Sequence, residues 1–408
     1  PDGDGLTNAE EEARGSHPRG TFQRFLAEGA TIDIGFTNFA TRIALANPSV
    51  AQTATVLLRF QRAAGAEVPT LVSLPPLQSR QVVVNDVPGM AGAEFATLVE
   101  SDVEVVVDRQ MWWNRQEAYG THAEGAVKAP SLVWYLAEGA TINNLQLFYL
   151  IQNPNPVPVQ VTVKYLLSGA PPVEEVIPVG RETRETVWVN TRTAQGVSLD
   201  GQQLSAVISA PPSTPIIVER ALYRDPARDF SFPAGHESAG VTTPGTRWLL
   251  AEGSTEGFDQ FVLIANPNDT DANVTLTFLL PQGAPVVRTR PVPRNSRDTF
   301  WLNLDAELAA TPVSTIVTSD VPIIVERAMW WPATPEQPTA NWFEAHNSAG
   351  AQGTARKWLL AEGGSGIPNF LDTYILLANT SSRAGRARGT LGFGGGPPPL
   401  VKEVHLGA

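Results

Sequence analysis

Charged residues of the types that perform acid–base chemistry recur at regular intervals along this 408-residue chain. A glutamate lies in each copy of the phrase Leu-Ala-Glu-Gly, at Glu28, Glu138, Glu252 and Glu362, with spacings of 110, 114 and 110 residues. An acid followed by arginine also recurs, as Asp108-Arg109, Glu219-Arg220 and Glu326-Arg327. General acid–base catalysis needs two nearby ionisable side chains, one to donate a proton and one to accept it. Catalysis is therefore one interpretation of these residues.

A structural role is the interpretation that we favour for the same residues. Each acid–arginine pair lies in a run of branched aliphatic residues typical of a strand, so one of its charges shares a face with apolar side chains. A buried charge is costly unless it has a partner. We therefore predict semi-buried ion pairs joining the first and last strands of each module: Glu28 with Arg109, Glu138 with Arg220, and Glu252 with Arg327. Three near-copies favour a scaffold over three active sites, and we expect no enzyme activity.

A histidine follows each acid–arginine strand, at His122, His236 and His346. One histidine among variable neighbours lacks the ligand spacing of a metal site, so we predict loop histidines that bond to the backbone between modules. The sequence contains no glycine-rich phosphate loop, nucleophile elbow or zincin motif. No cofactor is expected to be required.

Two pairs of adjacent tryptophans end two of these strands: Trp112, Trp113, Trp330 and Trp331. Neighbouring residues of a strand face opposite ways, so one tryptophan of each pair should enter a core. The other suits either sugar stacking or a contact with the next module. We favour the contact between modules, because the linkers are short.

The fixed spacing predicts an array of similar modules rather than one large domain. Each module holds about seven short runs rich in Val, Ile, Thr and aromatic residues, bounded by Pro, Gly, Asn or Ser. This pattern predicts an all-β protein, with tandem immunoglobulin-like antiparallel β-sandwich modules in an elongated array. The predicted boundaries are a linker at 1–20, modules at 21–128, 129–243 and 244–353, and an incomplete fourth module at 354–408.

The fourth copy reaches Ala408 before the position of its acid–arginine strand. We expect the missing strands to come from a longer chain, with a second copy of the chain as the alternative. A third interpretation is that residues 356–365 mainly complete module 3.

The first eleven residues match a calcium loop without its leading aspartate. Asp2 and Asp4 take the third and fifth positions, Leu6 offers a carbonyl, Asn8 takes the ninth position, and Glu11 is the terminal carboxylate. Calcium is the candidate ligand here, and a solvated Asp/Gly linker is the equal alternative.

Two families resemble parts of this sequence. Residues 1–11 resemble thrombospondin type 3 calcium repeats. From residue 22 onward the chain resembles an uncharacterised repeat of bacterial surface proteins, with its Trp-Tyr-Leu-Ala-Glu-Gly-Ala-Thr opening at 134–141 and its His-Asn-Ser segment at 346–348. This resemblance implies an extracellular location and a modular β architecture.

Composition narrows the choice of function. The formal net charge of −12 disfavours nucleic acid and anionic membrane surfaces as partners, and no apolar run approaches the length of a membrane span. The absence of cysteine excludes disulfides and thiolate metal sites.

We expect an extracellular structural protein of the bacterial surface (a stalk, sheath or filament subunit) whose partners are copies of itself or neighbouring modules. The alternative is an adhesin or carbohydrate-binding array that uses exposed tryptophans against surface glycans, and a hydrolase has little support.

Overall fold

The computed structural model describes residues 9, 11, 16–35, 37–115, 118–331, 342–360, 373–381, 383–391 and 400–407. Its elements are antiparallel β-strands joined by turns and a few single-turn 3-10 helices, so the chain is all-β as predicted. Among these residues, no helix has the length and apolar character needed to pass through a lipid bilayer.

Module 1 consists of two antiparallel sheets. Its strands are β1 (Phe22–Leu26), β2 (Asp33–Ile34), β3 (Thr37–Ala46), β4 (Ala54–Arg62), β5 (Val68–Leu74), β6 (Ser79–Val83), β7 (Phe95–Ser101), β8 (Val106–Arg115) and β9 (Ala118–Gly125). One sheet has the order β1-β7-β4-β5, and the other has the order β2-β3-β8-β9 with β6 also paired to β3.

Module 2 repeats this plan with two four-stranded sheets. Its strands are β10 (Val133–Leu136), β11 (Leu145–Asn153), β12 (Val159–Leu167), β13 (Val173–Val179), β14 (Thr183–Trp188), β15 (Thr193–Ala194), β16 (Val197–Ser198), β17 (Leu204–Ser209), β18 (Ile217–Arg224) and β19 (Ala234–Ala239). The sheet orders are β10-β17-β12-β13 and β14-β11-β18-β19, and β15 and β16 form a separate two-stranded ribbon.

Module 3 differs in one respect, because a single long strand belongs to both of its sheets. Its strands are β20 (Gly245–Leu250), β21 (Asp259–Asn266), β22 (Ala272–Leu279), β23 (Val286–Val292), β24 (Ser296–Trp301), β25 (Ser314–Trp331) and β26 (Glu344–Ala349). The first half of β25 pairs with β20 and β22, and its second half pairs with β21 and β26. In module 2 the corresponding positions are taken by two separate strands, β17 in one sheet and β18 in the other.

The core of each module follows from strand alternation. Along β12, Val161, Val163 and Tyr165 are buried, while the residues between them are less so. An immunoglobulin constant-type domain has seven strands, whereas module 2 has eight strands in its two main sheets. The eighth strand, β19, contains His236. The sequence analysis predicted a loop there, and that prediction is wrong for all three histidines, which lie in β9, β19 and β26.

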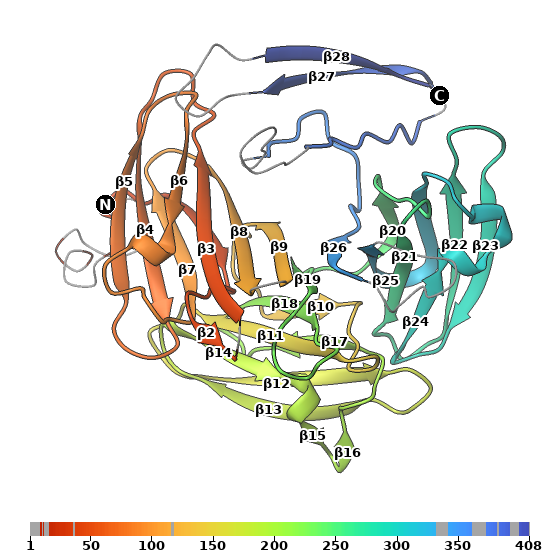
Figure 1. Cartoon of the computed structure of the whole chain (residues 1–408), viewed down its shortest axis with the longest axis horizontal. Coiled ribbons are helices and arrows are strands. Elements are labelled where there is room, and N and C mark those ends of the chain that lie inside the picture. Colours follow the sequence, from red (N-terminus) through yellow and green to blue (C-terminus); the bar gives the residue numbers. More distant parts are fainter. Residues whose placement is uncertain are drawn as a thin grey trace.

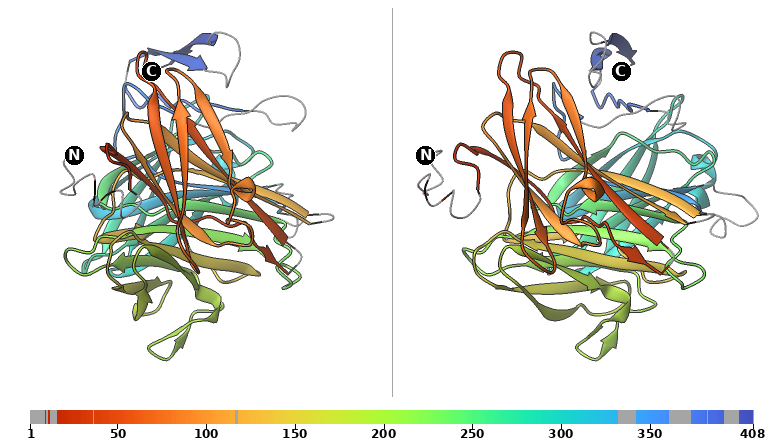
Figure 2. Two further views of the ribbon diagram at one scale, coloured as in Figure 1. Left: turned by 90° about the vertical axis from the view of Figure 1, so that its left-hand side faces the viewer. Right: turned by 60° about the vertical axis from the view of Figure 1, so that its left-hand side comes forward.

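The three modules lie around a common centre rather than end to end (Figures 1 and 2). Strands β9, β19 and β26 meet at this centre, and β9 of module 1 also contacts β26 of module 3. One hydrophobic cluster includes Phe39 of module 1, Leu222 of module 2 and Trp330 of module 3. The predicted elongated arrangement is therefore wrong, because the histidine strand of each module (β9, β19 or β26) supplies a face that packs against its neighbours.

The glycine of the recurring Leu-Ala-Glu-Gly phrase is explained by close packing. A Cβ atom on Gly139 would lie 2.7 Å from the carbonyl oxygen of Leu204, and one on Gly253 would lie 2.5 Å from the carbonyl oxygen of Val313. In module 1, a Cβ atom on Gly29 would lie 2.4 Å from the ring of Phe95. The phrase therefore ends in glycine because the opposite strand leaves no room for a side chain.

Gly139→Ala is expected to lower the free energy of unfolding by about 1–3 kcal/mol, because the Leu204 backbone cannot move aside as a flexible side chain can. Urea unfolding followed by tryptophan fluorescence would measure this loss. Gly353→Ala is the matched control, since no atom lies within 4 Å of its added Cβ. Equal stability of the two variants would contradict this account of the phrase.

The asparagine of the recurring Asn-Pro turn anchors the backbone. Asn153 Nδ2 donates to the carbonyl oxygens of Val157 and Gly180, at 2.8 and 2.7 Å, and its Oδ1 accepts from the amide of Asn155. Asn47 and Asn266 make the corresponding bonds in modules 1 and 3. The asparagine side chain therefore fixes the turn that follows each of these strands.

Residues of the fourth copy form a hairpin of β27 (Gly385–Leu391) and β28 (Leu400–Leu406). The hairpin lies on the side of the centre that modules 1, 2 and 3 leave open (Figure 1). Four of its large apolar side chains, Leu391, Leu400, Val401 and Val404, are exposed, and so is Trp358 of the opening phrase. The equivalent Trp134 and Trp248 are buried in modules 2 and 3.

Candidate functional site

The structure brings together all three predicted ion pairs. Arg109 Nη2 lies 3.5 Å from Glu28 Oε2, Arg220 Nη2 lies 3.3 Å from Glu138 Oε2, and Arg327 Nη1 lies 2.6 Å from Glu252 Oε2. The guanidinium groups are buried, because the acid–arginine strand of each module (β8, β18 or β25) presents its arginine to the loop that follows the first strand.

The acids that precede Arg220 and Arg327 have different partners, which lie in the preceding module. Glu219 of module 2 accepts from Arg109 Nη1 at 2.6 Å and from the amide of Glu28 at 2.7 Å. Glu326 of module 3 accepts from Arg220 Nη1 at 2.6 Å and from the amide of Ala137 at 2.7 Å. Arg109 and Arg220 therefore each pair with a carboxylate of their own module and with the bridging acid of the next module. We call these contacts junction 1–2 and junction 2–3.

The histidine strands complete the two junctions, with an aromatic residue of the later module covering the histidine of the earlier one. In junction 1–2, Tyr223 donates its hydroxyl to Glu28 Oε1 at 3.0 Å and lies 3.1 Å from His122 Nε2. In junction 2–3, the ring of Trp330 lies 5.1 Å from that of His236. The aromatic residue lies four positions after the bridging acid in both cases.

A second contact recurs farther from the centre. Thr183 at the start of β14 donates to the carbonyl oxygen of Arg62 in module 1, at 2.8 Å. Ser296 at the start of β24 donates to the carbonyl oxygen of Leu167 in module 2, at 3.0 Å. The two junctions are thus built from equivalent strands that make equivalent contacts.

Junction 1–2 holds an excess of carboxylates among its described residues. Glu28, Glu219 and Glu237 pair with Arg109, and Glu124 lies opposite Arg109 in the β8–β9 register. Burial raises the pKa of Glu237 well above its ordinary value, against the opposing effect of Arg109. Burial and then the charge of Glu219 raise the pKa of Glu124 to about 8.

Burial followed by the charge of Arg109 lowers the pKa of His122 well below its usual range. His122 is therefore neutral near neutral pH and does not offset the excess of carboxylates in junction 1–2.

Junction 2–3 is better balanced in charge. Asn347 of module 3 takes the position that Glu237 of module 2 has in junction 1–2. Asn347 Nδ2 donates to Glu138 Oε2 at 2.8 Å. Ser238 takes the place of Glu124 and accepts from Arg220 Nη2 at 2.6 Å. Although burial opposes it, the charges of His236 and Arg220 lower the pKa of Glu138.

Glu124→Ser is expected to stabilise the protein more at about pH 8 than at about pH 5, by on the order of 2 kcal/mol. Between the unfolded pKa near 4.5 and the folded pKa near 8, the native state holds a proton that the unfolded state lacks. The free energy of unfolding therefore falls as pH rises through this window. Serine occupies the equivalent positions of modules 2 and 3, Ser238 and Ser348. The Glu124→Ser variant has no carboxyl group to titrate here and so avoids this loss.

Urea unfolding at both pH values would measure this effect. Glu174→Ser, at an exposed position of β13, is the control and should leave the pH dependence unchanged. The same pH slope in the Glu124→Ser variant and in the parent protein would contradict the prediction.

One group in junction 1–2 has the spacing of a metal site. Ligand atoms of Glu28, His122 and Glu237 lie within 4.8 Å of one another, and all three residues are buried. Arg109 already lies against both glutamates, so its guanidinium takes the place that a cation would need. The arrangement fits an ion-pair network rather than a metal centre.

The four predicted tryptophans divide between the interior and the surface. Trp113 and Trp330 are buried, and Trp112 and Trp331 are partly exposed. Trp113 Nε1 donates to the carbonyl oxygen of Phe232 at 2.6 Å, which ties module 1 to module 2. Trp330 lies against His236 and stacks on Trp342 at 4.9 Å. Both buried rings contribute to contacts between modules.

Most of the candidate calcium loop lies outside the described residues, namely Asp2, Asp4, Leu6 and Asn8. Glu11 is described and is buried, and its carbonyl oxygen accepts from the amide of Ser16 at 3.0 Å. Glu362 of the fourth phrase is also outside the described part of the chain.

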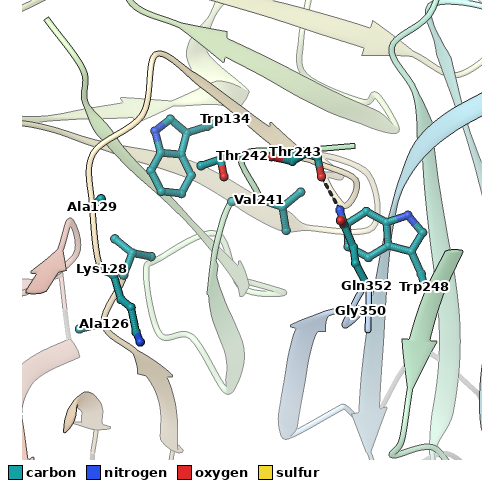
Figure 3. Close-up of a pocket in the computed structure, with 12 residues that line it drawn as sticks. Ala126, Lys128, Ala129, Trp134, Val241, Thr242, Thr243, Trp248, Gly350 and Gln352 are labelled. Atoms are coloured by element: carbon teal, nitrogen blue, oxygen red, sulfur yellow. Dashed lines mark hydrogen bonds between the residues drawn. The ribbon is translucent and has the colours of Figure 1, made fainter. Parts of the chain in front are cut away.

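An open cavity of about 570 Å³ lies where the segments that connect the modules come together (Figure 3). It is lined by Ala126, Val127, Lys128, Ala129, Trp134, Gly240, Val241, Thr242, Thr243, Trp248, Gly350 and Gln352. A hydrogen bond from Gln352 Nε2 to the carbonyl oxygen of Thr243 crosses one side. Its lining contains no carboxylate and no histidine, so the recurring ionisable groups do not face it.

Comparison with known proteins assigns no family. No protein-family model matches the chain, and no curated protein is significantly similar to it. The crystal structure of Thermotoga maritima 1070 is similar at 15% sequence identity, with 26% of this chain and 94% of that chain covered and a TM-score of 0.25. The Anabaena sensory rhodopsin transducer is similar at 26% identity, with 21% and 85% covered and a TM-score of 0.19. Scores this low carry no argument about function.

Proposed function

We propose that this protein is a non-enzymatic structural repeat protein of the bacterial cell surface, whose recurring charged residues lock its modules to one another. The observation that carries the proposal is where these groups lie. Glu28, Arg109, Glu138 and Arg220 are buried between modules, out of reach of a substrate. The bridging carboxylates of Glu219 and Glu326 accept from an arginine and from a backbone amide rather than facing open solvent.

The arrangement gives each junction more than one kind of contact. Charge-assisted hydrogen bonds join the arginine of one module to the acid of the next, and aromatic residues cover the histidines. Such contacts fix how two modules sit against each other, which suits a load-bearing or assembling protein. The extracellular location is proposed only from the resemblance of the sequence to repeats of bacterial surface proteins.

The adhesin alternative receives less support. Two of its four candidate tryptophans, Trp113 and Trp330, are buried against module 2. Trp112 and Trp331 keep some exposure, but they lie in different modules, and the guanidinium of Arg42 lies 5.0 Å from the Trp112 ring.

Two measurements together test the proposed function. Protease treatment of intact host cells, followed by immunodetection, should remove the protein if it lies outside the cell. Electron microscopy of the native material should show it in a regular surface assembly. A protected intracellular protein would contradict the location, and polysaccharide or peptide turnover lost in a Glu138→Gln variant would contradict the non-enzymatic role.

A further inference from the structure

The two junctions differ in charge at three equivalent positions. Junction 1–2 has Glu94, Glu124 and Glu237 where junction 2–3 has Gln203, Ser238 and Asn347. Four further positions have the same type of charge in both, namely Glu28 and Glu138, Glu219 and Glu326, Arg109 and Arg220, and Arg184 and Arg297. At these seven positions, junction 1–2 therefore has five carboxyl groups for two arginines, whereas junction 2–3 has two for two.

One guanidinium group serves three buried carboxyl groups in junction 1–2. Arg109 pairs with Glu28, Glu219 and Glu237, and all four side chains are buried. The second arginine, Arg184, is already paired with Glu94 at 2.9 Å. One cation cannot balance three ionised carboxylates away from water, so the closed junction favours carboxyl groups that keep their protons.

The corresponding contacts of junction 2–3 are neutral. Arg220 donates to the hydroxyl of Ser238 at 2.6 Å, and Arg297 donates to the side-chain oxygen of Gln203 at 3.3 Å. Asn347 donates to Glu138 at 2.8 Å, in the position where junction 1–2 has a carboxyl group. The same strands thus build one junction with an excess of acid and one without.

The surroundings of Glu124 and Glu237 are mainly acidic. The ionisable groups that face this pair come from every element packed around it: Glu28 in the loop after β1, Glu94 before β7, Asp108 and Arg109 in β8, His122 in β9, Arg184 in β14, Glu219 and Tyr223 in β18, and His236 in β19. Burial and then the charge of Arg109 lower the pKa of His122, so this histidine adds no cation near neutral pH.

We propose that junction 1–2 is a pH-sensitive joint that opens as the pH rises, so that module 1 separates from module 2 while junction 2–3 stays closed. The closed joint holds its excess carboxyl groups in protonated form, and these groups ionise once water reaches them. Ionised carboxylates in excess of the arginines repel one another, which favours the open joint. The inference goes beyond the proposed structural role and depends only on the contacts of the two junctions.

The direction of the pH effect follows from where the protons are held. Burial raises the pKa values of Glu28 and Glu237, and burial followed by the charge of Glu219 raises the pKa of Glu124 to about 8. Between the ordinary value of 4.5 and the raised value, only the closed joint holds these protons, so a rise in pH favours the open joint. His122 acts the other way, because the open joint lets it bind a proton at acidic pH. Three carboxyl groups outweigh one histidine.

Three alanines at the same position of the recurring phrase can report the opening of each junction. Ala27 and Ala137 are fully buried in junctions 1–2 and 2–3, whereas Ala251 of module 3 is exposed. The chain has no cysteine, so a cysteine placed at one of these positions is the unique thiol. The thiol-labelling rate at a buried position, divided by that of Ala251→Cys at the same pH, measures opening and corrects for ionisation of the thiol itself.

The first test uses the full chain. The corrected labelling rate of Ala27→Cys should rise at least about tenfold between about pH 6 and about pH 8, because each proton lost on opening changes the equilibrium about tenfold per pH unit. That of Ala137→Cys should change less than about twofold. Combining Glu124→Ser with Glu237→Asn gives junction 1–2 the residues of junction 2–3 and should abolish the rise for Ala27→Cys.

The reverse exchange should create a pH-sensitive joint where there is none. Combining Ser238→Glu with Asn347→Glu gives junction 2–3 the same excess of acid, so the corrected labelling rate of Ala137→Cys should then rise at least about tenfold over the same pH range. If this variant does not fold, the two thiols of the parent chain and the first exchange still decide the question.

The inference is overturned if the corrected rates of Ala27→Cys and Ala137→Cys rise together, because the whole chain is then unfolding. It is also overturned if neither rate responds to pH, or if the Glu124→Ser, Glu237→Asn chain keeps the rise. A chelator that increases labelling of Ala27→Cys at about pH 7 as much as alkaline pH does would overturn it as well, because a metal ion then balances the carboxylates. None of these results bears on the extracellular location or the absence of enzyme activity, which the experiments above test separately.

Discussion

Arg220→Met is expected to lower the free energy of unfolding by about 3–5 kcal/mol, because it leaves two buried carboxylates without their cation. Arg220 bonds to Glu326 of module 3 at 2.6 Å and lies 3.3 Å from Glu138 of its own module. Methionine keeps much of the side-chain volume, so the loss reports charge rather than a cavity. Chemical unfolding followed by tryptophan fluorescence would measure it.

Two further variants make this prediction specific. Arg192→Met removes a surface pair with Glu175 in the same module and should cost much less, because water screens that pair. Adding Glu326→Gln to Arg220→Met should recover part of the loss, because one orphaned charge is removed. If Arg220→Met costs no more than Arg192→Met, the junction is not held together in the way described.

Trp113→Ala is expected to destabilise the protein by about 3–5 kcal/mol, the usual range for removing a large buried aromatic side chain. The Trp113 ring lies 5.2 Å from that of Tyr223 in an edge-to-face arrangement, and its Nε1 bonds to the carbonyl oxygen of Phe232. The variant therefore loses both a core ring and a bond between modules. Thermal unfolding by calorimetry would give the size of the loss.

Trp112→Ala is the matched control, because the neighbouring ring is partly exposed and contacts Arg42. It should cost about 1 kcal/mol or less. Glycan-array binding of the same two variants separates the two candidate functions. Glycan binding that Trp112→Ala abolishes without loss of stability would favour the adhesin over the structural protein.

Much of the fold could be predicted from the sequence, because short β-branched runs and a fixed repeat are local signals. The repeated phrase also led to the pairing of Glu28 with Arg109 and its equivalents, since a charge among aliphatic residues needs a partner. The histidine strand was missed because its Gly, Ser and Ala residues resemble a loop when the neighbouring β-strands are unknown.

The contact between modules could not be predicted in the same way. Nothing local to Glu219 distinguishes a partner in its own module from one in the module before, and Glu28, whose amide it accepts from, lies 191 residues away. The one available signal was that a histidine follows each acid–arginine strand at a similar distance. A further strand paired with the acid–arginine strand would have implied a sheet face on which another module could pack.

The direction of these contacts has a consequence for biosynthesis. A ribosome releases the chain from its N-terminus, so module 1 emerges well before Glu219 and Glu237 have been translated. Arg109 then has only the carboxylates of its own module, and its burial becomes favourable once module 2 arrives. Each newly made module thus completes the one before it, which gives co-translational folding a fixed order.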